Sequence, residues 1–284
     1  MTSAEQYAAS VDAVNAQRDR LQGEQLPDDR WGGETVQRFR YDPRRSLDAN
    51  LEAIASYVQR EEVLIDVGGG AGRLSLPLAL RCREVVNVDA SAGMLAAFEE
   101  LAAGAGIQNA RAVKAEWLAA EDIHGDVILV SNVTYFVRDI VPFVQKLEGA
   151  SRRRVIILVW SEPPPNLSSS LFRLVYGEEL EPSPGHRALL PVLWDMGILP
   201  DVRVLPMGPT MVGLPPDVRY PRTYEEAMAY SLAGRWLSPR DRDRARGVIE
   251  AHFQELFEQT SEGFRPLWLM DTRELLITWE PHTP

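Results

Sequence analysis

Cysteine is almost absent from this chain of 284 residues, which contains Cys82 alone. A single cysteine excludes an internal disulfide and a metal cluster built on several thiolates. It also suits a reducing compartment. We expect Cys82 itself to be a small buried apolar residue on a helix.

Long apolar runs are also missing, and basic residues are in deficit. No stretch reaches the length of a membrane-spanning helix, and the first residues are too polar for a signal peptide. We therefore expect a soluble, cytoplasmic protein with no membrane partner. The chain has 30 Lys and Arg against 41 Asp and Glu, a formal net charge of −11. This balance disfavours a protein that holds nucleic acid by neutralising phosphates, so no nucleic-acid partner is expected.

One glycine-rich stretch organises what is present. Val63 to Val67 is a short apolar run, which is typical of a buried strand in a parallel sheet. Gly68, Gly69, Gly70 and Gly72 follow, and then a helix that tolerates Pro77 in its first turns. A strand, a bare loop and a helix N-terminus together offer N–H donors to an anionic group.

Two common ligand fingerprints do not fit this loop. A phosphate-binding P-loop needs a Lys followed by Ser or Thr, which is missing here. A dinucleotide fingerprint counted from Gly68 has Arg73 where a small residue is needed. The residues instead spell acidic-x-G-x-G-x-G, with Asp66 at the end of the strand. In this motif the sequence resembles the class I S-adenosylmethionine-dependent methyltransferases.

The resemblance implies S-adenosylmethionine as the cofactor. Its carboxylate would sit on the loop N–H groups, and Asp66 would face its cationic part. An acid at Asp66 would repel the pyrophosphate of a nicotinamide dinucleotide. A tight turn that binds no ligand is the alternative interpretation of the glycine loop alone.

Residues after the second and third predicted strands extend this predicted site. Asp89 ends the strand that begins at Glu84, and its carboxylate can accept hydrogen bonds from both ribose hydroxyls of an adenosine. NAD and S-adenosylmethionine both contain this ribose, so Asp89 does not choose between them. It could instead cap the following helix. By the resemblance, the Met94 side chain flanks the adenine and Ala90 belongs to the cofactor site, although Met94 could equally be core. Glu116 and Trp117 are expected to bracket the adenine, with Trp117 packed on its face.

The loop after the fourth strand is where the resemblance places the transferred methyl group. Asn132 and Tyr135 are the best polar candidates there, and Asn132 is also expected to contact the cofactor. No His, Glu or Asp stands out as a general base, so the catalytic residues stay unassigned. No metal site is expected.

The predicted fold is an α/β, doubly wound, mostly parallel seven-stranded Rossmann-like sheet with helical cap insertions. We expect a lid segment at residues 1–46 and a cofactor-binding core at 47–161, which continues at 191–207 and ends with a strand in 266–284. Two cap insertions, 162–190 and 208–265, would enclose a small-molecule methyl acceptor. Candidate lid or acceptor-binding residues are Trp31, Tyr41, Tyr135, Phe172, Tyr176 and His186.

Two other functions stay open at this point. One is a nicotinamide-dependent oxidoreductase, which Arg73 and Asp66 disfavour. The other is a protein that binds S-adenosylmethionine without transferring its methyl group. The sequence identifies neither the acceptor nor the oligomeric state.

Overall fold

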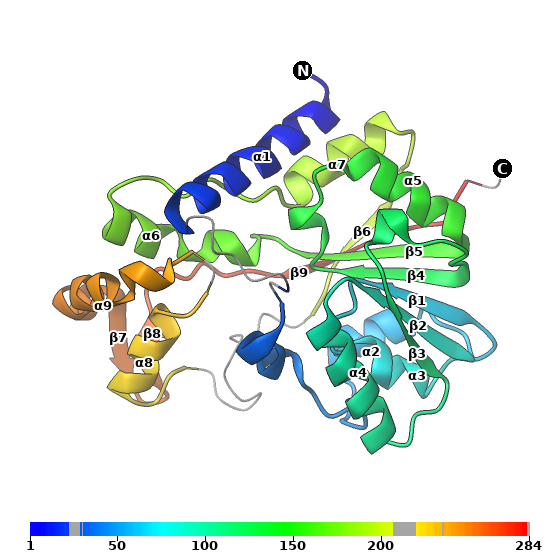
Figure 1. Ribbon diagram of the computed structural model, residues 1–284, viewed down its shortest axis with the longest axis horizontal. Helices are drawn as coiled ribbons and strands as arrows, with labels where there is room; N and C mark the ends of the chain where they lie inside the picture. The colour runs from blue at the N-terminus through cyan, green and yellow to red at the C-terminus, as the bar shows by residue number, and fades with distance from the viewer. Residues whose placement is uncertain (23–28, 30, 207–219, 235, 283–284) are drawn as a thin grey trace.

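The structure is a computed structural model, which describes residues 1–22, 29, 31–206, 220–234 and 236–282. A seven-stranded sheet forms its centre, in the order β3-β2-β1-β4-β5-β9-β6 (Figure 1). The strands are β1 Val63–Val67, β2 Glu84–Asp89, β3 Ala110–Lys114, β4 Gly125–Ser131, β5 Ser151–Trp160, β6 Asp201–Val204 and β9 Glu274–Trp279.

Strand β9 is the antiparallel member of this sheet, since it runs against both β5 and β6. The neighbours from β3 to β5 are all parallel. The predicted doubly wound, mostly parallel fold is therefore confirmed. Strand β6 is shorter than the sequence suggests, because it ends at Val204, and Met207 lies outside the described residues.

Helices cover both faces of the sheet (Figure 1). On one face lie α1 and α5, with α7 beside them, and on the other lie α2, α3 and α4. The bounds are α1 Ser3–Gln22, α2 Ala49–Ala55, α3 Ser75–Ala79, α4 Ala92–Gly104, α5 Ile140–Ala150 and α7 His186–Asp195.

Alternation along the strands decides which side chain faces which helix layer. In β4, Ile128 and Val130 belong to the apolar cluster under α1, α5 and α7. Val127 and Leu129 of the same strand belong to the cluster under α2, α3 and α4. A parallel sheet covered on both faces needs such continuous apolar strands.

Side-chain caps fix where several helices begin. Asp48 accepts from the N–H of Leu51 at the start of α2, and Ser91 accepts from the N–H of Met94 at the start of α4. Thr223 and Glu226 form a complete capping box at α8. These contacts place each helix start relative to the strand before it.

A second part of the chain lies beside the carboxyl edge of the sheet (Figure 1). It contains α6 Ser169–Tyr176, α8 Tyr224–Ser231, α9 Arg242–Ala251, α10 Phe253–Leu256 and the hairpin β7 Phe257–Thr260 with β8 Gly263–Pro266. These elements share an apolar cluster of their own, and we refer to them as the cap. The hairpin was not predicted from the sequence. The helix α7 begins at His186, before the boundary at residue 191 that the sequence suggested.

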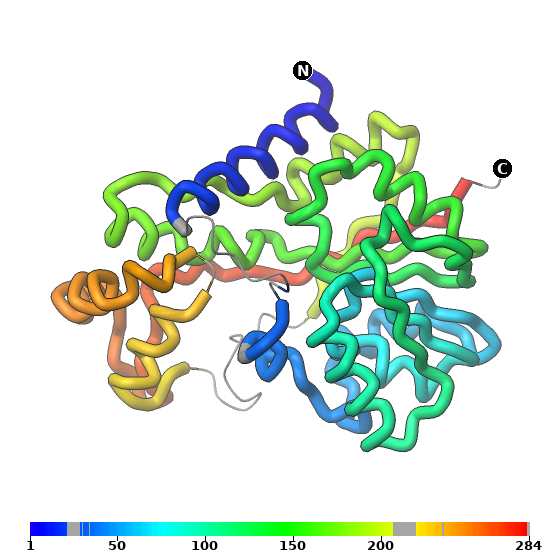
Figure 2. Tube along the Cα trace, viewed as in Figure 1, coloured from blue at the N-terminus to red at the C-terminus, as the bar shows by residue number. Residues whose placement is uncertain are grey.

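Short 3₁₀ helices complete the chain, and one of them matters for the site. They are η1 Gly33–Phe39, η2 Trp117–Ala119, η3 Thr134–Phe136, η4 Pro164–Ser168 and η5 Pro239–Asp241. The segment around η1 lies between the cap and α4 (Figure 2). Among the described residues, no helix is both long and apolar enough to cross a membrane.

Candidate active site at the carboxyl edge of the sheet

The glycine loop turns over the end of β1 through three residues with positive φ. These are Gly68 at 68°, Gly70 at 55° and Gly72 at 80°, a region that favours glycine. Their N–H groups donate to Val88 O at 2.7 Å, Asp89 Oδ2 at 2.9 Å and Gly69 O at 2.9 Å, respectively. These three donors therefore serve the loop itself, rather than being available for a carboxylate as expected.

An added Cβ would meet different neighbours at the glycines of the loop. A Cβ on Gly69 would lie 2.2 Å from Asp66 Oδ2, and one on Gly72 would lie 2.6 Å from the Leu76 and Phe98 side chains. A Cβ on Gly70 would meet only the Met94 sulfur, at 3.6 Å. Gly70 is therefore the one of these three positions where an added Cβ would meet an ordinary contact instead of a clash, and it is partly exposed.

Asp66 lies beneath the loop and is 2% exposed. Burial raises the pKa of its carboxyl to about 6, and Asp89 raises it further, while Ser75 and Arg73 oppose the rise. The expectation that Asp66 faces the cofactor directly is not met in this arrangement. Its charge can act on a bound cation only through the loop.

Asn87 is a site residue that the sequence analysis missed. Its Nδ2 donates to Gly70 O at 2.8 Å, and its side chain lies against Gly69. The residue is fully buried and its Oδ1 has no partner among the described residues. The available signal was a polar residue inside the otherwise apolar strand Val85–Val88.

Asp89 stands at the end of β2, half-buried, where the sequence placed it. Its Oδ2 accepts from Gly70 N and its Oδ1 from Ser91 N at 2.8 Å. Burial raises the pKa of this carboxyl. Each carboxylate oxygen keeps a lone pair beyond these bonds, so the group can still accept two ribose hydroxyls.

The residues expected around the adenine differ in their accessibility. Met94 is buried between Gly70 and the lid, and Ala90 and Glu116 are exposed at the rim. Trp117 is 5% exposed and packs in the core, with the Lys146 ammonium 5.0 Å from its ring centroid. The prediction that Trp117 offers a free ring face is therefore wrong for this structure.

Asn132 and Tyr135 are joined at the end of β4. Asn132 has a φ of 59°, and its Oδ1 accepts from the Tyr135 hydroxyl at 3.1 Å. That hydroxyl also accepts from Trp160 N at 2.6 Å, and burial raises the pKa of the phenol. Through these two hydrogen bonds the buried Tyr135 side chain links β4 to β5, so we assign it a structural role and not a catalytic one. Asn132 stays the polar candidate here.

Two of the candidate acceptor residues belong to the core of the cap. Phe172 is 1% exposed, with its ring centroid 4.7 Å from that of Tyr176. The Tyr176 hydroxyl donates to Asp241 and accepts from Ser238 N, both at 3.1 Å. Phe172 therefore fills the core of the cap instead of lining a pocket, whereas Tyr176 is half-buried and its place at the acceptor stays a prediction.

His186 lies near the end of β5, at the start of α7. Burial lowers the pKa of its imidazole, Arg187 adds to this, and Glu162 opposes it. Its Nδ1 is buried and has no partner within the described ranges. The Glu162 carboxylate accepts from Asn166 Nδ2 at 2.7 Å, and its charge raises the pKa values of both His186 and Tyr135.

The two aromatic residues of the predicted lid, Trp31 and Tyr41, contact different elements. Trp31 packs edge-on against Phe136, with ring centroids 5.7 Å apart, and against Phe39 at 6.1 Å. Tyr41 lies under the Arg45 guanidinium, 5.3 Å from the ring centroid. Arg45 in turn donates to Arg73 O at 2.6 Å, which ties this segment to the loop.

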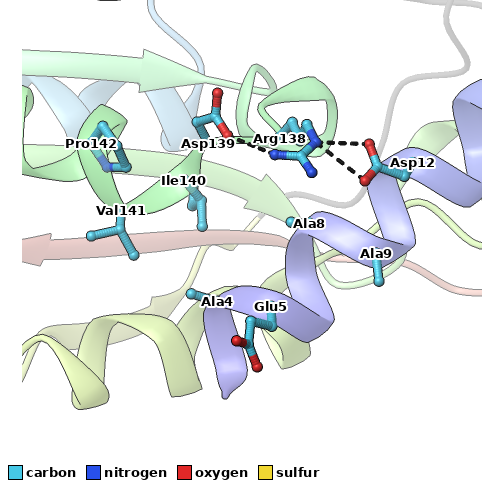
Figure 3. A pocket seen from close by; sticks show the side chains of 10 residues that line it. All are labelled: Ala4, Glu5, Ala8, Ala9, Asp12, Arg138, Asp139, Ile140, Val141 and Pro142. Carbon is cyan, nitrogen blue, oxygen red and sulfur yellow. Dashed lines mark hydrogen bonds and ion pairs between the residues drawn. The ribbon is translucent and has the colours of Figure 1, made fainter. Parts of the chain in front are cut away.

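A separate groove of about 380 Å³ lies between α1 and the start of α5 (Figure 3). Its charged groups are already engaged, because Arg138 bonds both Asp12 and Asp139, and Glu5 accepts from Thr2 N. The rest of its lining is small and apolar. We interpret it as the seam along which α1 packs on the domain.

The sequence matches a known protein family over part of its length. Residues 65–159, about a third of the chain, match the family described as methyltransferase domain. This match begins in β1 and ends in β5. Residues 65–159 are therefore a methyltransferase domain, of the class I S-adenosylmethionine-dependent kind. Its cofactor is S-adenosylmethionine.

Solved structures share the fold of this methyltransferase. A putative methyltransferase from Bacillus halodurans C-125 is 12% identical, with a TM-score of 0.55 over 83% of this chain and 98% of that one. The YcgJ protein from Bacillus subtilis is 14% identical, with a TM-score of 0.54 over 83% and 99%. Coclaurine N-methyltransferase, bound to N-methylheliamine and S-adenosylhomocysteine, is 14% identical, with a TM-score of 0.50 over 97% and 87%.

A curated relative matches only a short part of the methyltransferase. It is the 23S rRNA (uracil(1939)-C(5))-methyltransferase RlmD of Aeromonas salmonicida, 39% identical over 72 residues. That match spans 25% of this chain and 15% of the relative. Such a short match leaves the acceptor of the present chain open.

Proposed function

We propose that this protein transfers the methyl group of S-adenosylmethionine to a small-molecule acceptor held between the carboxyl edge of the sheet and the cap. The observation that carries the proposal is the Asp89 carboxylate bonded to the N–H of Gly70, a partly exposed loop position where an added Cβ would meet only the Met94 sulfur. A nucleoside lying across Gly70 would place its ribose hydroxyls at Asp89.

The bound cofactor would supply a methyl group on a sulfonium, which is an activated leaving group. The protein therefore contributes mainly alignment of the acceptor and exclusion of water. We propose that Asn132 orients the acceptor at the end of β4. Glu162 and His186 both follow β5 in the chain. We propose that they line the side of the site where an acceptor would lose its proton.

The small-molecule acceptor follows from charge and from the cap. The net charge of −11 disfavours a nucleic acid, whose phosphates need basic contacts. Elements from both predicted insertions build the cap, which packs around its own apolar cluster and lies beside the carboxyl edge of the sheet. We propose that a small molecule, which can be surrounded by the sheet edge and the cap, is the acceptor.

The test of the cofactor site is a calorimetric titration of S-adenosylhomocysteine into the wild type and Asp89→Ala. The variant loses two charge-assisted hydrogen bonds to the ribose, so we expect affinity to fall by about 100-fold or more. Glu99→Ala is the matched control, because Glu99 is an exposed acid on the neighbouring helix α4. Equal affinities for the wild type and Asp89→Ala would contradict the assignment.

Two further measurements separate the alternatives. Titrations of NAD and NADP that give tighter binding than S-adenosylhomocysteine would favour an oxidoreductase. Formation of S-adenosylhomocysteine is then followed with a panel of amines, phenols and carboxylic acids. Tight cofactor binding without turnover on any panel member would favour the non-catalytic binding protein.

A further inference from the structure

The segment that precedes η1 is bound to the start of α4 through one carboxylate, that of Asp29. Its Oδ2 accepts from the Ser91 hydroxyl at 2.9 Å and from Gly93 N at 3.0 Å. Its Oδ1 accepts from Trp31 N at 3.1 Å. One side chain therefore joins the helix that follows Asp89 to the aromatic residue that reaches toward β4.

The charge of Asp29 suits this position. The first N–H groups of a helix have no partner within the helix, and the helix dipole is positive there. Burial opposes the ionisation of Asp29, but bonds from Gly93, Ser91, Trp31 and Gly32 outweigh it and hold its pKa below the usual value. The carboxylate is thus ionised at neutral pH and makes charge-assisted bonds.

The backbones also meet closely at this contact. A Cβ on Gly93 would lie 3.1 Å from Gly32 Cα and 3.4 Å from Asp29 Oδ2. Two glycines therefore allow the segment to lie directly on the first turn of α4. A larger residue at Gly93 would hold the carboxylate away from the Gly93 N–H.

The same segment contacts α4, the glycine loop and the residues after β4. Val36 packs with Met94, Ala97 and Ala71, which lie on α4 and in the glycine loop. Trp31 packs against Phe136 beyond the end of β4. Figure 2 shows this segment between the cap and α4. Because Met94 packs with Val36 and its sulfur lies by Gly70, a nucleoside bound at Gly70 would lie next to this segment.

We propose that Asp29 is a latch: its bonds to Ser91, Gly93 and Trp31 hold residues 31–39 closed over the cofactor and so set how fast the cofactor is released. This role rests on the proposed function, because it needs the cofactor to bind at Gly70 and Asp89. Asp29 acts through the segment it fixes, which makes it a positioning residue and not a catalytic one.

The experiment compares wild type, Asp29→Asn and Asp29→Ala in stopped-flow release of S-adenosylhomocysteine. We expect Asp29→Ala to speed release by about tenfold or more, because two charge-assisted bonds are lost. Asp29→Asn keeps one acceptor oxygen without the charge, so it should fall between the two. Asp19→Asn is the matched control, since Asp19 is exposed on α1 and its side chain pairs with Arg18.

Amide hydrogen exchange of the cofactor-free proteins gives a second readout. Faster exchange in Asp29→Ala should be confined to residues 31–39 and to the first turn of α4, with an unchanged melting temperature. Exchange that rises throughout the sheet would mean a general loss of stability, and this would overturn the latch.

The outcomes separate the latch from the proposed function. A wild type that binds no S-adenosylhomocysteine contradicts the proposed function, and with it the control of release. Normal binding by the wild type, together with release from Asp29→Ala at the wild-type rate, refutes the latch alone.

Discussion

The buried carboxyl of Asp66 predicts an unusual dependence of stability on pH. Its pKa lies at about 6 in the folded chain against 3.8 for an ordinary aspartate. This difference corresponds to about 3 kcal/mol of preference for the protonated form in the folded state. Between pH 4 and pH 6 the folded chain therefore binds more protons at Asp66 than the unfolded chain does.

The sign follows from linkage between proton binding and folding. Where the folded state binds more protons, the free energy of unfolding falls as the pH rises. The contribution of Asp66 is complete below about pH 4 and is lost by about pH 6. Asp66→Asn removes this titration, because an amide does not ionise. We expect the variant to gain up to about 3 kcal/mol on the wild type between these pH values.

The assay is urea unfolding of the wild type and Asp66→Asn between pH 4 and pH 8, followed by tryptophan fluorescence. Asp126→Asn is a control of opposite sign. Burial works against the ionised form of Asp126, but Val63 N and Arg152 outweigh it and lower the pKa of that carboxyl. Asp126→Asn should therefore lose stability relative to the wild type as the pH rises. A difference between Asp66→Asn and the wild type that stays constant with pH would refute the reasoning.

Two further substitutions test the geometry of the site. Gly69→Ala places a Cβ 2.2 Å from Asp66 Oδ2 and should cost about 1–3 kcal/mol by overpacking, measured by urea unfolding. Gly149→Ala on α5, where a Cβ meets nothing within 4 Å, should instead add about 0.5–1 kcal/mol, and equal effects would contradict the clash. Tyr135→Phe leaves the N–H of Trp160 unpaired and should cost about 1–3 kcal/mol, while the pH profile of turnover stays unchanged. A shifted profile would restore Tyr135 as a catalytic candidate.

The sheet was predictable because its signals are local and repeated. Each buried strand is a short apolar run that ends in a turn, and alternating helices and strands give a doubly wound sheet by general rules. The place of Asp89 at the end of β2 was predictable for the same reason, because the carboxyl ends of neighbouring parallel strands meet at one edge. The hairpin β7–β8 gave no comparable signal, since its two strands have only four residues each and neither is an apolar run.

The roles of individual side chains were harder to predict. An aromatic residue gives the same sequence pattern whether it lines a pocket or fills an apolar core. Phe172 and Trp117 were expected to face ligands, yet each fills an apolar cluster. What separates the two cases is the set of neighbours, and those neighbours come from distant parts of the chain. Asp29 was missed for the same reason, since its partner Ser91 is 62 residues away. A carboxylate in a turn-rich segment can be given a role only when the structure shows that it lies at a helix N-terminus.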